Sequence, residues 1–199
     1  MNPDTQKTSI PLHRNVDFSL LLFAQGLSIT GREIGTIVLP LLVLAMTGSA
    51  FHVGMIASMQ ALPYLLLSLP AGALVDRWDR KRVMLICEYI RVIALLTVPT
   101  AWLVYELQLL HLYLVAFFTG VAFVFYNVAE IAAIPQIVSK DQLPKAMSAT
   151  NVVEWSGELT GPAIGGFLVG LAKTTLIGAM LAYLVQGLMQ FMSVLSLTA

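Results

Sequence analysis

The sequence predicts an all-α membrane protein with six transmembrane helices. Hydrophobic residues make up 58% of the 199 residues and charged residues 11%, whereas soluble domains average about 25% charged residues. A helix needs about 20 apolar residues to cross a bilayer, and six stretches have the required length. They are residues 16–46, 51–75, 83–105, 112–134, 149–172 and 176–197. A polar tail, residues 1–15, precedes the domain formed by residues 16–199.

Turn-forming residues separate these stretches and prolines interrupt them. The first stretch is longer than a crossing requires, which predicts a tilted helix. It ends before Gly48, and Pro144 marks the turn before the fifth stretch. Pro63 and Pro70 lie within the second stretch, where each removes a backbone donor. We therefore expect a bent or loosened second helix.

The turn between the second and third stretches holds a dense group of charges. They are Asp76, Arg77, Asp79, Arg80, Lys81 and Arg82. Short loops rich in Lys and Arg stay in the cytoplasm, and this orientation also places Lys7, Arg14, Lys140 and Lys145 there, against Lys173 outside. We therefore expect a multi-pass protein of the plasma membrane with both chain ends in the cytoplasm. A topology signal alone would explain this turn.

A more specific interpretation comes from the spacing in this turn. Gly72, Asp76, Arg77 and Arg80 follow the pattern G-x-x-x-D-R-x-G-R-R, with Asp79 in place of its second Gly. This pattern resembles the loop between helices 2 and 3 of major facilitator superfamily transporters. The resemblance implies that Asp76 acts in a conformational latch, that Arg77 and Arg80 support it, and that Gly72 permits close approach of a neighbouring helix.

The fifth stretch carries a second pattern of small residues. Gly157, Gly161 and Gly165 recur every four residues, a spacing that lets two membrane helices approach closely. Together with Pro162 and Gly166 they also resemble the G-x-x-x-G-P-x-x-G-G signature in the fifth helix of drug:proton antiporters of the same superfamily. Ser148 stands where that signature usually begins with Gly.

Further stretches resemble one branch of the superfamily, the macrolide and siderophore efflux transporters. They are residues 39–50, 62–82 and 134–146. The resemblance implies proton-driven export of amphipathic small molecules by alternating access. It also implies that these six helices, two inverted three-helix repeats, are the N-terminal half of a twelve-helix fold. The expected partners are the lipid bilayer, the substrate, protons and a second six-helix half, either a C-terminal half or another copy.

Charged residues at membrane depth are functional candidates because they are costly to bury. Arg32 and Glu33 are adjacent and point about 100° apart on a helix, so they need not pair. Glu88 and Arg91 are three residues apart on one helix face, which predicts an internal ion pair. We also expect that Arg91 could reach toward Asp76.

The fifth stretch adds Glu154 and Glu158, one helical turn apart. Two carboxylates in a low dielectric repel each other, so at least one is expected to hold a proton near neutral pH. Glu158 is the preferred proton site, whereas Glu154 could instead pair with Lys145 or Arg91. Glu130 is expected to lie at the interface as a partner of Lys140 or Arg82.

Two alternatives to an exporter stay open. A membrane-embedded hydrolase would need a nucleophile or acid-base group inside the bundle, but His13, His52 and His111 all lie at loops or span edges. A truncated or regulatory half-subunit without transport of its own is the other alternative. No cofactor, metal or nucleic-acid partner is expected, because the formal net charge is zero and no metal-ligand or phosphate-binding motif is present.

Overall fold

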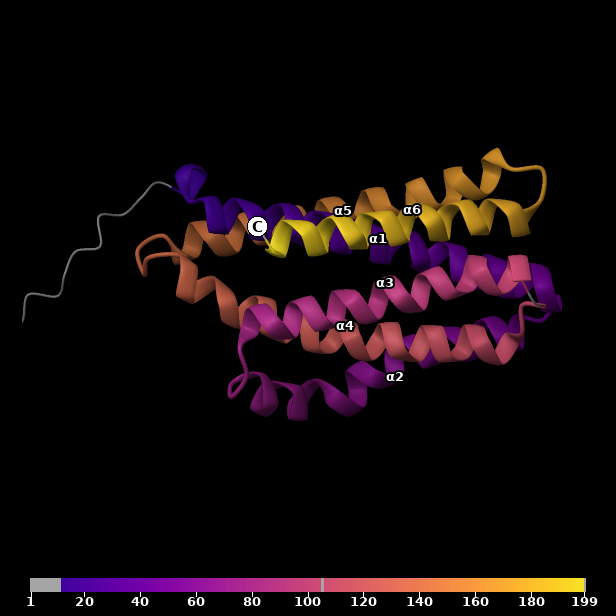
Figure 1. The fold of residues 1–199 in the computed structure, drawn as a ribbon, viewed down its shortest axis with the longest axis horizontal. Coiled ribbons are helices and arrows are strands. Elements are labelled where there is room, and N and C mark those ends of the chain that lie inside the picture. Colours follow the sequence, from indigo (N-terminus) through magenta and orange to yellow (C-terminus); the bar gives the residue numbers. More distant parts are fainter. Residues whose placement is uncertain (1–11, 105, 199) are drawn as a thin grey trace, which may run out of the picture.

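The computed structural model describes residues 12–104 and 106–198, which form six long α-helices after one short 3-10 turn. No strand occurs in these residues. The elements are η1 (Leu12–Arg14), α1 (Val16–Thr47), α2 (Ala50–Val75), α3 (Arg80–Val104), α4 (Leu109–Ile137), α5 (Leu143–Leu171) and α6 (Thr175–Thr198). They run up and down along the long axis of the molecule (Figure 1). The predicted all-α class is confirmed.

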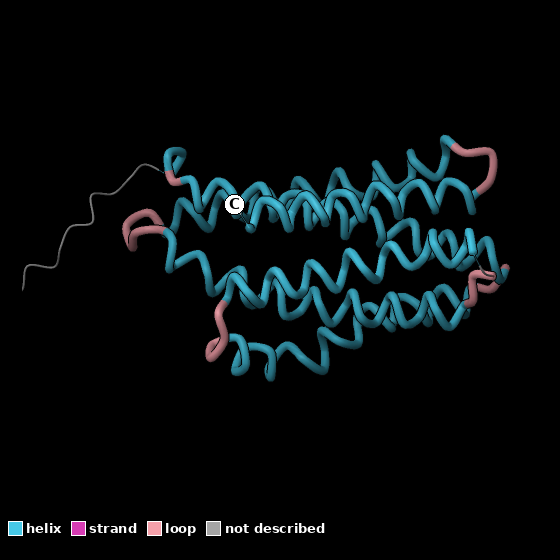
Figure 2. The backbone as a smooth tube through the Cα atoms, in the orientation of Figure 1, coloured by secondary structure: helices cyan, strands magenta, loops and turns pink. Residues whose placement is uncertain are grey.

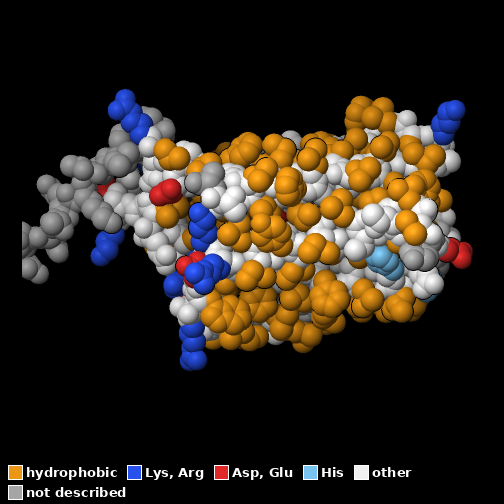
Figure 3. All heavy atoms as spheres, in the orientation of Figure 1, with side chains coloured by type: hydrophobic (Ala, Val, Ile, Leu, Met, Phe, Trp, Pro, Cys, Tyr) orange, Lys and Arg blue, Asp and Glu red, His pale blue; other side chains and the backbone are white. Residues whose placement is uncertain are grey.

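Five of the six α-helices are long and apolar enough to cross a membrane; α5 is the exception. Three charged residues and a series of Gly, Ser and Thr lower the apolar content of α5. Large hydrophobic side chains are exposed along the other helices, as in Leu65, Leu69 and Leu103. Figure 3 shows this hydrophobic surface over the body of the bundle, with Lys and Arg gathered mainly at one end. That end, which includes the α2–α3 turn at residues 76–79 and the α4–α5 turn at 138–142, is called the basic end below.

The helix contacts show that α1–α3 and α4–α6 occupy equivalent places in the bundle. Helix α1 packs mainly against α5 and α6, whereas α4 packs mainly against α2 and α3. Exchanging α1–α3 with α4–α6 converts the first set of contacts into the second, and the corresponding helices α3 and α6 also pack together. Successive helices are antiparallel within α1–α3 and within α4–α6. Because each group has three helices, α4 starts at the end of the bundle opposite to the start of α1 (Figure 2, in the orientation of Figure 1). This is the arrangement of an inverted three-helix repeat.

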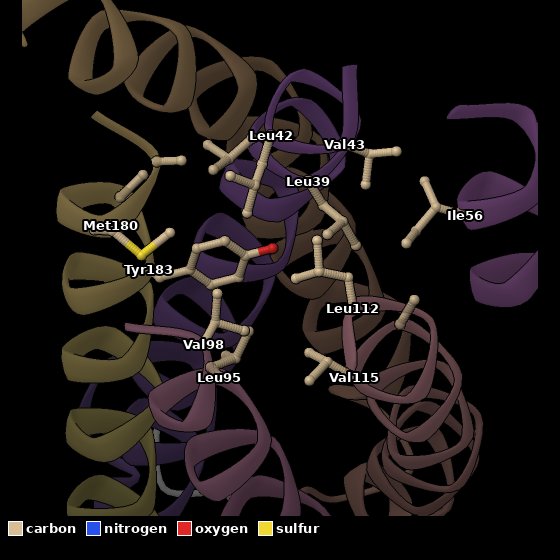
Figure 4. Packing of buried hydrophobic residues seen from close by; sticks show 14 of the residues in the cluster. Leu39, Leu42, Val43, Ile56, Leu95, Val98, Leu112, Val115, Met180 and Tyr183 are labelled. Atoms are coloured by element: carbon tan, nitrogen blue, oxygen red, sulfur yellow. The ribbon is translucent and has the colours of Figure 1, made fainter. Parts of the chain in front are cut away.

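Buried apolar side chains form two clusters separated along the bundle. The first includes Leu42, Val98, Leu112 and Tyr183. Figure 4 shows the Tyr183 ring among the side chains of this cluster. The second lies toward the basic end and includes Phe18, Val75, Met84 and Ile134. Buried polar residues occupy the helical turns between the two clusters. They are Gln25 and Ser28 on α1, Glu88 and Arg91 on α3, and Gln186, Gln190 and Ser193 on α6. We call these seven residues the polar layer.

Hydrogen bonds fix the chain at the basic end. The Asn15 side chain caps α1 by accepting from the Phe18 N–H at 3.1 Å, and its Nδ2 donates to the Ile137 carbonyl at 2.7 Å. The Ser196 hydroxyl donates to the Leu20 carbonyl at 2.9 Å. The start of α1 is therefore tied to the ends of α4 and α6.

Candidate functional site

The centre of the polar layer is Arg91, which is 2% exposed. Its Nη1 donates to the Ser28 hydroxyl at 2.7 Å, and its Nη2 donates to the Ser28 carbonyl at 3.3 Å. Nη1 also lies 3.4 Å from Oε1 of the fully buried Glu88. The expected Glu88–Arg91 pair is therefore present. The guanidinium is held by α1 rather than by Asp76, so the suggested reach toward the α2–α3 turn was wrong.

Helix α6 closes the polar layer with neutral side chains. The Gln190 side-chain amide donates to the Ser28 carbonyl at 3.1 Å, and the Ser193 hydroxyl donates to Glu88 Oε1 at 3.4 Å. These residues are neutral, so the pattern of charges in the sequence does not point to them. A usable signal was present: Gln186, Gln190 and Ser193 recur at spacings of four and three residues, which places them on one face of an apolar helix.

Arg32 and Glu33 form the second described ion pair, with Arg32 Nη2 and Glu33 Oε1 2.6 Å apart. The sequence left open whether these neighbours pair, and they do because two long side chains can bridge the angle between adjacent positions. The Arg32 guanidinium also lies 4.2 Å from the centre of the Phe123 ring on α4, a cation–π geometry. The pair is only partly buried, with side chains 27% and 12% exposed.

Two cavities adjoin Arg32 and Arg91. The larger, of about 110 Å³, is lined by both arginines and by apolar and amide side chains including Leu39, Phe123 and Gln186. A smaller one is lined by both arginines, Gln25, Glu130 and Glu154, among others. Arg32 and Arg91 therefore line both cavities.

Glu130 is the residue whose position departs furthest from expectation. It is 4% exposed, and neither described ion pair includes it. The prediction of an interfacial partner for Lys140 or Arg82 was wrong because α4 continues to Ile137, about two helical turns beyond Glu130. Glu130 lines the smaller cavity instead of lying at the surface.

The glycines of α5 form a seam against α1. A Cβ on Gly157 would lie 2.6 Å from Ile29 Cγ2, and one on Gly165 would lie 2.9 Å from the Ile34 carbonyl oxygen. A Cβ on Gly161 would lie 2.9 Å from the Thr30 carbonyl oxygen and would overlap the Cβ of Glu33. The predicted close approach is therefore present at these three positions.

The other residues of the α5 motif have different surroundings. Gly166 faces open space, with no heavy atom within 4 Å of an added Cβ. Pro162 lies partly buried within a helix that continues past it to Leu171.

The two glutamates of α5 also lie in different environments. Glu154 is partly buried and lines the smaller cavity, whereas Glu158 is exposed on the outer face. Neither of the two described ion pairs joins Glu154 to Lys145 or Arg91. Although only one helical turn apart, Glu154 therefore lines an internal cavity and Glu158 lies on the surface of the bundle.

The α2–α3 turn resolves into distinct roles for its two aspartates. Asp79 caps α3, since its Oδ1 accepts from the Arg82 N–H at 2.9 Å and its carbonyl accepts from the Val83 N–H at 3.0 Å. The Asp76 side chain is exposed, and its carbonyl accepts from Arg80 Nη2 at 3.3 Å. An added Cβ on Gly72 would meet no described atom within 4 Å, so the helix approach expected there is not made within the described chain. Arg77, Lys81 and Arg82 are exposed.

These features together define a class of protein. An α-helical bundle with a lipid-compatible surface, an inverted repeat and a charged interior is the architecture of a membrane transport domain. The family model described as Major Facilitator Superfamily matches residues 21–198. The chain therefore belongs to the major facilitator superfamily and is a multi-pass membrane protein.

Curated relatives include efflux proteins. The chain is 30% identical to the multidrug efflux pump Tap of Mycolicibacterium fortuitum over 75% of this chain and 38% of the relative. It is 26% identical to the enterobactin exporter EntS of Shigella dysenteriae over 77% of this chain and 37% of the relative. The chain is 26% identical to the uncharacterized MFS-type transporter YfiS of Bacillus subtilis over 80% of this chain and 37% of the relative. The chain thus spans less than two fifths of the length of these relatives.

Proposed function

We propose that this protein exports amphipathic small molecules, drug-like or siderophore-like, by alternating access driven by protons. The observation that carries the proposal is the similarity to a multidrug pump and an enterobactin exporter over three quarters of the chain. The charged interior supports it, because ionisable groups at membrane depth are typical of substrate and proton pathways.

The larger cavity supports an amphipathic substrate. It combines apolar and aromatic walls, such as Leu39, Leu95 and Phe123, with the Arg32 guanidinium and the amides of Gln60 and Gln186. Pockets with apolar walls and a few polar groups suit small organic ligands. In this proposal a second six-helix half, a C-terminal half or another copy, supplies the opposite wall.

The α2–α3 turn supports a switching role for Asp76. Its side chain is exposed and is part of neither described ion pair, so it is available to a helix of the second half. Asp79, Arg77 and Arg80 would hold the turn in shape around it. In the proposed orientation the basic end faces the cytoplasm of a prokaryotic cell, because short basic loops are retained there.

Proton coupling is assigned in this proposal to carboxyl groups of the interior and of α5. Glu88 is buried against Arg91, Glu154 lines a cavity, and Glu158 lies one turn further along α5. Arg32, which pairs with Glu33, lines the larger cavity in which the substrate would bind. Exchange of a proton at one of these groups would change the charge that faces the substrate.

A transport assay tests the proposal. The protein, purified from its native membrane at its native length, is reconstituted in liposomes with an imposed pH gradient, and the movement of a lipophilic cation and of a macrolide is followed. We expect movement that depends on the gradient and is lost in Asp76→Asn. Asp79→Asn is the matched control and should keep transport, because Asn also caps helices. Transport that is absent with both compounds, or equal in Asp76→Asn, would contradict the proposal.

A further inference from the structure

We propose that Glu130 on α4 is a proton-binding site of the bundle and that its carboxyl group is protonated in the conformation described here. The sequence motifs do not point to this residue, and its burial became evident only from the fold. Its use in transport rests on the proposed function, whereas the presence of the proton on Glu130 does not.

The buried charged groups near Glu130 do not balance if all of them are ionised. Glu88, Arg91 and Glu130 are all at least 96% buried. Arg91 can neutralise one carboxylate, and its described ion-pair partner is Glu88. Arg32 is paired with Glu33 at 2.6 Å. If every group were ionised, the buried set would keep one uncompensated negative charge, which is very costly away from water. A single proton on one carboxylate removes it.

The two buried carboxylates have different surroundings. Oε1 of Glu88 accepts hydrogen bonds from Arg91 Nη1 and from the Ser193 hydroxyl, each at 3.4 Å, while its Oε2 is buried without a hydrogen-bond partner among the described residues. Oε1 of Glu130 is also buried without such a partner, and so is Oε1 of Gln25, which lines the same cavity as Glu130. A protonated carboxyl group is a hydrogen-bond donor as well as an acceptor. The Gln25 oxygen is an acceptor across the cavity that such a donor could use directly or through a water molecule.

The charged groups that face Glu130 from the neighbouring helices agree with this assignment. Arg32 on α1 and Glu154 on α5 line the same cavity, and Glu88 and Arg91 on α3 and Glu154 act on Glu130 electrostatically. On α4 itself the neighbour is the buried Tyr126. Because Arg32 is paired with Glu33, Arg91 is the remaining guanidinium group for three carboxyl groups, those of Glu88, Glu130 and Glu154. Glu154 is the partly exposed carboxylate of this set, so it is placed to exchange a proton with Glu130 Oε1.

Infrared spectroscopy of the protein in lipid nanodiscs tests the assignment without any transport assay. A protonated carboxylic acid has a C=O stretching band that is distinct from the bands of a carboxylate. We expect this band in the wild-type protein at neutral pH, with a small shift in deuterated water. Glu130→Gln should remove it, and the shorter acid in Glu130→Asp should move it to a different frequency. Glu154→Gln and Glu88→Asp are matched controls that should leave its frequency unchanged.

Several outcomes would overturn the inference: no such band in the wild type, a band that persists in Glu130→Gln, or a band that moves in Glu88→Asp but not in Glu130→Asp. Circular dichroism of each variant ensures that only folded protein is compared, and Glu130→Asp preserves the test if Glu130→Gln does not fold. If the band behaves as expected but gradient-driven transport is absent, the proposed function fails and the proton site stands. If transport is present but the band is unaffected in Glu130→Gln, the proton site alone fails.

Discussion

The charged residues inside the bundle and those on its surface are of the same residue types, but their side chains have different contacts. Arg91 is fixed by Ser28 of α1 and by Glu88, and α6 adds Gln190 and Ser193 to the same group. Glu158 is exposed on the outer face of α5, and Asp76 is exposed at a turn. The interior set links three helices, whereas the surface set leaves its side chains available to other molecules.

This difference separates stability from switching. Removing a member of the interior set leaves a buried charge without its partner, so the bundle itself should weaken. Removing a surface member should leave the bundle intact and affect only what it contacts during transport. The following predictions use this contrast and run from the largest expected effect on stability to the smallest.

Replacement of the buried guanidinium should have the largest effect. Arg91→Met leaves Glu88 as a buried charge without a partner, and breaking such a pair costs about 3–5 kcal/mol. Unfolding of the purified protein by a denaturing detergent, followed by circular dichroism, measures the loss. The control is Arg77→Met at an exposed position, where stability should stay close to wild type. Equal stability of the two variants would show that the polar layer does not hold the bundle together.

The seam between α5 and α1 comes next. Gly161→Ala forces a methyl group against the Thr30 carbonyl and Glu33, and overpacking of this kind costs about 1–3 kcal/mol. Gly166→Ala adds the same methyl group to the same helix in open space, so it should not destabilise the protein. Thermal denaturation of the two variants in one detergent gives the comparison. A lower midpoint for Gly166→Ala than for Gly161→Ala would contradict the packing described for α5.

The two aspartates of the α2–α3 turn should differ by a smaller amount. Asp79→Ala removes the cap of α3 and should cost about 1 kcal/mol, whereas Asp76→Ala should have little effect on unfolding because its side chain is exposed. Asp79→Asn should restore the loss, since the amide oxygen can accept the same hydrogen bond. A failure of Asn to restore it would mean that the negative charge of Asp79, rather than its cap, is needed.

Glu158→Gln should have the smallest effect on stability, within about 0.5 kcal/mol, as for other surface substitutions. Gradient-driven transport in liposomes should nevertheless fall if Glu158 exchanges protons or meets a cationic substrate in the whole transporter. Unchanged transport in this variant would remove Glu158 from the proton pathway and leave the interior carboxyl groups as the candidates.

The sequence predicted the helices well because membrane crossing sets a simple requirement of length and apolar content. It also predicted the Glu88–Arg91 pair and the α5 seam, because both depend on spacing within one helix. It could not show that Glu130 is buried, since its burial depends on residues that α1, α3 and α5 bring to the same cavity. Ser28 and Gln190 were missed for a related reason: neutral side chains become notable only when another helix brings a charge to them.

The outcomes at Arg32 and Gly72 have equally local causes. Side-chain length allowed Arg32 and Glu33 to pair despite their angle on the helix. Gly72 meets no neighbour within the described chain, so a role in close packing would require a helix from a second half. Resemblance to a family pattern identified the turn, but it did not specify which contacts lie within this chain.

The proposed coupling of export to protons through carboxyl groups of the interior and of α5 can be tested by counting protons during transport. Liposomes containing the native-length protein and a trapped pH indicator are given a substrate gradient with no initial pH difference. We predict that substrate moving down its gradient drives protons in the opposite direction, and that Glu130→Gln abolishes this proton movement while substrate binding is retained. Substrate movement with no accompanying pH change in the wild-type protein would contradict it.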